Sequence, residues 1–166
     1  MVNKFNKIGK LIWLLIFSGL MASTAAVVAG PPKEMGGWEL GSPYNKLYKA
    51  AELDSFKAEV VKVMEVVPMA GMLPGVALRV KEPGGEAVDV QVCPSWYIEP
   101  GNVGLKRGDK VKIRGVWAEI DGRDVFMASK IKKGDYFVLK VRLTKDGTPF
   151  WTMSPEQLAK EKQDKK

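Results

Sequence analysis

The sequence of 166 residues contains no histidine and only one cysteine, Cys93. Without histidine the chain cannot build a Ser-His-Asp triad, an imidazole-ligated zinc site or the CxxCH motif that attaches c-type haem. A single cysteine cannot form an internal disulfide, so an apolar core must stabilise the fold. The acidic residues that could pair for catalysis lie at turns, where Asp is ordinary turn chemistry. We therefore expect a protein that is not an enzyme.

The first 29 residues have the order of a secretory signal. Lys4, Lys7 and Lys10 precede an uncharged apolar run that becomes rich in small residues toward its end. We predict a signal peptide over residues 1–29, cleavage before Gly30, and export to the periplasm or the extracellular space. The alternative is an uncleaved anchor in the inner membrane, because about 20 apolar residues are enough to cross a bilayer.

The positive charge of the chain is concentrated at its two ends. The whole sequence has 26 basic and 19 acidic residues, and three of the lysines lie in residues 1–29. The last seven residues, KEKQDKK, contribute a further net charge of +2. Because little positive charge remains on the body, we do not expect a nucleic-acid partner. Membrane contact is expected only through an uncleaved signal segment.

The rest of the chain reads as one small all-β domain, 55–151, between an arm and a charged tail, 152–166. The Gly- and Pro-rich stretch 30–42 predicts an extended, mobile arm, and 43–54 predicts a short helix or a wrap over the barrel. Runs with strand character follow at 56–67, 76–81, 87–93, 110–120, 125–132 and 136–143.

Local signals refine this pattern and predict the topology. The apolar phase slips at Val60-Val61, which indicates a bulge, and Asp121-Gly122 predicts a two-residue hairpin turn. Five strands in the order hairpin, third strand, crossover, hairpin, with one more strand at the C-terminus, fit an OB-like barrel. In the fourth strand charged residues should face water and apolar ones the core, with Gly115 bending the strand inward. Any other small curved barrel is the alternative.

Several segments carry a resemblance to a known family. In order, SPYNKLY, PMAGMLPGVAL, CPSWYIE, LKRGDKVKIRG and GTPFW resemble segments of small exported bacterial OB-fold proteins, which include relatives of a nitrite-reductase accessory protein in metal-reducing bacteria. The resemblance covers residues 42–151 and implies export and fold, but no activity. It also implies a partner in a redox or respiratory system. Relatives frequently have histidine where this chain has Ala77 and Gln91, and glycine where it has Cys93.

One candidate site is built from sulfur. Cys93 ends a strand pattern in which it points away from the core, so we expect partial exposure. It is then either an inert hinge residue, a redox-sensitive thiol or a ligand of a soft metal. Met69 and Met72 have the MxxM spacing and, with Cys93, could bind Cu(I) or Ag(I), whereas methionines that only fill gaps in the barrel are the alternative. No other cofactor is expected.

The second candidate site is a surface for a protein partner. Trp96 and Tyr97 lie in the crossover, where they either plug the barrel end or offer a stacking platform. A basic strip accompanies them: Lys106, Arg107, Lys110, Lys112, Arg114, Lys130, Lys132 and Lys133. We predict that these residues dock another envelope protein. A solvated face that protects strand edges, a Cu(I) or Ag(I) carrier, and a binder of polyanions or single-stranded nucleic acid by analogy with other OB folds are the alternatives.

Overall fold

The computed structural model describes residues 34–163, with side chains for residues 34–161. The predicted signal peptide, 1–29, lies outside the described residues. Among the residues that are described, no helix combines the length and the apolar character that a membrane span requires.

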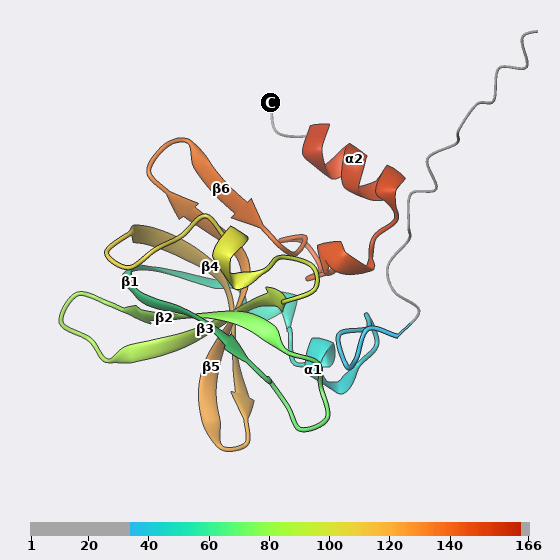
Figure 1. Ribbon diagram of the computed structural model, residues 1–166, viewed down its shortest axis with the longest axis horizontal. Helices are drawn as coiled ribbons and strands as arrows, with labels where there is room; N and C mark the ends of the chain where they lie inside the picture. The colour runs from blue at the N-terminus through green and yellow to red at the C-terminus, as the bar shows by residue number, and fades with distance from the viewer. Residues whose placement is uncertain (1–33, 164–166) are drawn as a thin grey trace, which may run out of the picture.

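The described residues form six strands and two short helices (Figure 1). The strands are β1 (Asp54–Val66), β2 (Gly75–Lys81), β3 (Ala87–Pro94), β4 (Lys110–Ile120), β5 (Arg123–Lys133) and β6 (Phe137–Lys140). Helix α1 (Pro43–Lys46) precedes them and helix α2 (Pro155–Gln163) follows. Three 3-10 turns complete the domain: Ala50–Glu52, Pro100–Asn102 and Phe150–Thr152.

Strands β1 to β5 close into a ring, which confirms the predicted OB-like barrel. Strand β1 pairs antiparallel with both β2 and β4, and the pairs β2–β3 and β4–β5 are also antiparallel. The parallel contact of β3 with β5, at Val90 with Phe126 and Gln91 with Met127, completes the ring. The crossover between β3 and β4 is that of an OB barrel. Strand β6 extends the sheet beyond β5.

Three residues have no partner opposite them and bend the strands. Val61 is the extra residue of β1, because Val60 pairs with Val80 and Lys62 with Arg79. This confirms the bulge that the sequence predicts. Val92 is skipped in the same way where β3 pairs with β2.

The tight hairpin turn predicted between β4 and β5 is also confirmed. Asp121 and Gly122 have positive φ angles, 50° and 71°, as such a turn requires.

Ser129 is the third extra residue and links three segments. Arg114 pairs with Lys130 and Gly115 pairs with Ala128, so Ser129 of β5 is left over. Its hydroxyl donates a hydrogen bond to the carbonyl oxygen of Arg114 at 3.1 Å, and its own carbonyl accepts from the backbone N–H of Val141 at 2.9 Å. The segment after Lys140 no longer pairs with β5 in the regular register. Strand β6 therefore ends at Lys140 and is shorter than the predicted strand 136–143.

The segment before β1 differs from the predicted mobile arm in its described part. Trp38 is fully buried and its Nε1 donates to the carbonyl oxygen of Leu73 at 2.9 Å. The carbonyl of Trp38 accepts from Nδ2 of Asn45 and from Nε1 of Trp151, both at 2.9 Å. Figure 1 shows this segment and the one after β6 on the same side of the barrel. Trp38 and Ser42 therefore anchor this segment, although Leu40 is 57% exposed, and Pro43–Lys46 form a short helix.

The tail also contains structure that the sequence analysis missed. The backbone N–H of Gln157 donates to Oγ of Ser154 at 3.3 Å, and the side chain of Gln157 accepts from the N–H of Ser154 at 2.8 Å. This reciprocal pair is a capping box, which begins α2. The Ser-x-x-Gln spacing of Ser154 and Gln157 is the sequence signal from which the start of this helix could have been predicted.

We expect Gly115→Ala to destabilise the fold. A Cβ atom at this position would clash with the carbonyl oxygen of Met127 and lie 2.8 Å from the ring of Phe126. Forcing β4 and β5 apart should lower the free energy of unfolding by about 2 kcal/mol, measured by urea denaturation. Gly101→Ala is the matched control, because nothing lies within 4 Å of a Cβ there. Equal stabilities of the two variants would contradict the close approach.

Candidate functional site

The register of four strands gathers six cations on one outer face of the sheet. Across β4 and β5, Lys112 lies opposite Lys132 and Arg114 opposite Lys130. On the other side of β4, Lys57 pairs with Lys112, and beyond β5, Lys140 pairs with Lys130. We call this set the basic face: Lys57, Lys112, Arg114, Lys130, Lys132 and Lys140.

The cations of the basic face form no ion pair with an acidic side chain among the described residues. The ion pairs among the described side chains are Lys49–Glu52, Arg79–Asp89 and Lys133–Asp109, and none of them involves the six cations. Partial burial lowers the pKa of Lys130, and the charges of Lys132, Arg114, Lys140 and Lys112 lower it further. Like charges directly opposite each other destabilise a sheet. Packing of the fold therefore does not account for this arrangement.

A hollow lies at the centre of the basic face and continues into a larger groove. The hollow has a volume of about 240 Å³ and is lined by Ser55, Lys112, Arg114, Lys130 and Lys132. The groove has a volume of about 870 Å³ and shares Lys112 and Lys132 with the hollow. It adds the lysines Lys57, Lys81 and Lys110, the acidic residues Glu59, Glu82 and Asp135, the turn between β2 and β3, and the apolar residues Ala58, Val61 and Val111.

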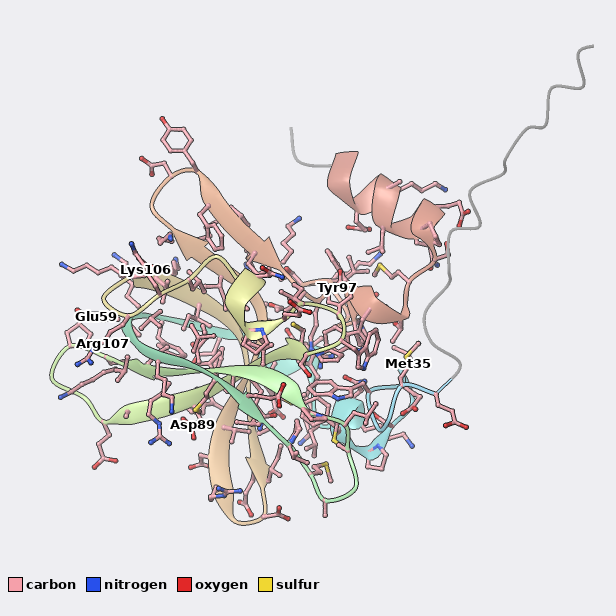
Figure 2. The ribbon with its side chains drawn as sticks, in the orientation of Figure 1. Met35, Glu59, Asp89, Tyr97, Lys106 and Arg107 are labelled. Atoms are coloured by element: carbon pink, nitrogen blue, oxygen red, sulfur yellow. The ribbon has the colours of Figure 1, made fainter. Side chains whose placement is uncertain are left out.

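The structure divides the basic strip that the sequence predicts. Lys112, Arg114, Lys130 and Lys132 surround the hollow, and Lys110 lines the groove. Lys106 and Arg107 lie beside Glu59 at one end of the barrel (Figure 2). Lys133 binds elsewhere, with 3.0 Å between its Nζ and Oδ2 of Asp109. The sequence analysis missed Lys57 and Lys140, because only the register brings them to this face.

The crossover pair lies apart from Lys106 and Arg107. Figure 2 shows Tyr97 on the side of the barrel near Met35, away from these two basic residues. The half-buried ring of Tyr97 lies 6.1 Å from that of the buried Trp151, whereas Trp96 is 36% exposed. Tyr97 therefore packs against the buried Trp151 and does not continue the strip formed with Lys106 and Arg107.

Cys93 is completely buried, so the expectation of partial exposure was wrong. The extra residue Val92 shifts the phase of β3 by one residue, so Cys93 pairs with the buried Val76 on the core side of the sheet. Burial raises the pKa of the Cys93 thiol to about 12, although the charge of Arg142 opposes the shift. A raised pKa disfavours the thiolate that a soft metal needs.

The rest of the sulfur site is a half-buried turn. Met69 and Met72 lie in the connection between β1 and β2 and pack against the core. The described residues contain no group of three or more Cys, Asp or Glu side chains that could hold a metal ion. Binding of Cu(I) or Ag(I) by the two methionines stays a prediction.

A buried arginine holds the two terminal segments together. The guanidinium carbon of Arg142 lies 4.8 Å from the ring centre of Trp151, 5.0 Å from that of Tyr48 and 6.0 Å from that of Tyr44. Its Nη1 donates to the carbonyl oxygen of Gly147 at 3.3 Å. Burial lowers the pKa of Arg142 and raises that of Tyr44 to about 12. These cation–π contacts are structural, because Arg142 is inaccessible to a partner.

The closed ring and its crossover define the chain as an OB-like β-barrel protein. Residues 52–138, which include β1 to β5, match the MamS/MamX magnetosome protein family, and the chain belongs to that family. The structure thus confirms the OB-like fold that the resemblance implies. The family that the match shows is the MamS/MamX magnetosome protein family. No curated protein matches the sequence.

Among solved structures, a replication protein A heterotrimer bound to ssDNA is similar to the chain. The TM-score is 0.38 and the sequence identity 16%, over 51% of this chain and 60% of that one. The chain therefore spans less than two thirds of the length of that protein. Similarity at this level carries no argument about ligands.

We expect the Cys93 thiol to be unreactive in the folded protein. Its pKa of about 12 leaves almost no thiolate at pH 8, and burial blocks access. Iodoacetamide labelling followed by mass spectrometry should give no adduct under native conditions and full modification in denaturant. Rapid labelling of the native protein would contradict the buried position.

We expect Lys130→Gln to stabilise the protein by about 0.5 kcal/mol at low salt, because it removes a like-charge pair. The gain should shrink with added salt. It should also fade as the pH rises from the lowered pKa of Lys130 toward the ordinary lysine value, since the wild-type amine then loses its charge in the folded state. Urea denaturation measures both trends, with the exposed Arg107→Gln as control. An equal effect of the two substitutions would contradict the repulsion.

Proposed function

We propose that the protein is an exported accessory module of the magnetosome that docks an acidic segment of another envelope protein on its basic face. The observation that carries this proposal is the pairing of Lys112 with Lys132 and of Arg114 with Lys130, without an acidic partner. An arrangement that opposes folding is understandable when a bound anion offsets the repulsion.

The alternative of a solvated face that protects strand edges does not explain these cations. Lysines on an edge strand prevent pairing with another chain. Strand β4, however, lies between β1 and β5, and β5 lies between β4 and β6. Lys112, Arg114 and Lys130 therefore stand on strands that have no open edge to protect.

The shape of the surface favours an extended acidic segment as the partner. The hollow and the groove share Lys112 and Lys132, so a chain that crosses both would contact lysines in each, whereas Glu59, Glu82 and Asp135 of the groove favour neutral or basic residues of the partner beside them. Apolar atoms of Ala58, Val61 and Val111 in the groove would accept apolar side chains placed between the acidic ones. Such a segment would gain both charge pairing and apolar burial.

The compartment and the type of partner rest on other evidence. The signal peptide expected over residues 1–29 supports export, and the family match supports a role in the magnetosome. A partner from a redox or respiratory system follows from the resemblance to relatives of an accessory protein. The charge and shape of the basic face supply the mode of contact.

Charge reversal tests the docking surface. The triple substitution Lys112→Glu, Arg114→Glu, Lys130→Glu should weaken binding of a fluorescent glutamate-rich peptide at least about tenfold, as loss of one charge-assisted contact already does. Wild-type affinity should fall with added salt. The matched control is Lys106→Glu with Arg107→Glu, which changes charges outside the face. If both variants weaken peptide binding equally while their circular dichroism spectra are unchanged, the proposal is contradicted.

A further inference from the structure

The hollow at the centre of the basic face contains only groups that donate hydrogen bonds to an anion. Four of its five lining residues are cations, and the fifth, Ser55, carries a hydroxyl. None of the lining residues is acidic. Ser55 pairs with Arg114 across β1 and β4, so the hydroxyl and the guanidinium come from opposite positions on neighbouring strands.

We propose that this hollow is a binding site for a tetrahedral oxyanion of charge −2, with the chemistry of phosphate. The inference rests on the proposed function, since it names the group that the centre of the docking face selects. The planar guanidinium of Arg114 matches two oxygens of such an anion, while Lys112, Lys130 and Lys132 act as point charges. The hydroxyl of Ser55 can donate to a further oxygen.

A dianion fits the hollow better than a carboxylate does. A carboxylate brings one negative charge and two oxygens, which leaves most of the four cations without a partner. A phosphoryl group brings a charge of about −1.5 to −2 and three strong acceptor oxygens. The closer match in charge and in number of acceptors should make the site prefer phosphate over acetate.

The position of Lys130 strengthens this selection. Lys130 is half-buried on β5 and has Lys132, Arg114, Lys140 and Lys112 as its charged neighbours. Water therefore reaches its ammonium group less freely than that of an exposed lysine. An anion in the hollow would replace the missing hydration and offset the repulsion at once.

Calorimetric titration of the full chain with inorganic phosphate tests the site. We expect saturable binding of one phosphate, with acetate binding at least about tenfold more weakly. Arg114→Gln and Lys130→Gln should each weaken phosphate binding about tenfold, and Ser55→Ala should weaken it less. Arg107→Gln, an exposed cation outside the hollow, should bind as the wild type does.

Two results would overturn the site: no saturable phosphate binding, or equal weakening by Arg107→Gln and Arg114→Gln. Loss of peptide binding on charge reversal, with no phosphate binding, would reject the site and leave the proposed function. Phosphate binding without peptide binding would reject the proposed function and leave the anion site.

Vesicles identify the source of the phosphate group. If vesicles with phosphatidic acid, whose headgroup is a phosphomonoester, bind the chain, vesicles of phosphatidylcholine do not, and Lys130→Gln reduces the binding, the group is a lipid headgroup. If neither vesicle binds while inorganic phosphate does, the group is carried by a soluble molecule. Both results support the anion site.

Discussion

The extra residue in β5, Ser129, is the constraint on which both the barrel and its basic face depend. Its hydroxyl donates a hydrogen bond to Arg114 of β4, and its carbonyl accepts one from Val141, which follows β6. Because Ser129 has no partner, the pairs on one side of it place Arg114 opposite Lys130, and those on the other side turn Gly115 toward the core. The same bulge that lets β5 cross toward β3 therefore also aligns like charges on the surface.

The basic face requires that the rest of the fold supply the stability that repulsion removes. The buried valines of β1 to β3 form one core with the terminal segments, and Trp38 belongs to it. Arg142 then holds the aromatic rings of the arm and the tail around its guanidinium group. This side of the molecule is buried, whereas the side with the hollow is charged and largely exposed. This division is consistent with the proposed docking of a partner on the charged side.

The sequence predicted what short-range patterns determine. Strand order, the bulge at Val61 and the turn at Asp121-Gly122 depend on local alternation and turn chemistry, and the structure confirms them. It could not predict features that depend on register, because residues 125–128, which precede Ser129, are continuously apolar and have no readable phase. For that reason the sequence analysis did not place Lys57 and Lys140 on the basic face. Cys93 was misplaced because the extra residue Val92, which the sequence analysis did not predict, shifts the strand phase and places Cys93 opposite Val76 on the core side.

The central claim is that the cations of the basic face are held close together until an acidic partner neutralises them. The most direct test is the pKa of the Lys130 ammonium group, measured by NMR in the absence and presence of a glutamate-rich peptide. We predict a pKa below the ordinary lysine value in the free protein, because of burial and the neighbouring cations, and a rise when the peptide binds. An ordinary pKa in the free protein, or one that the bound peptide leaves unchanged, would contradict the account.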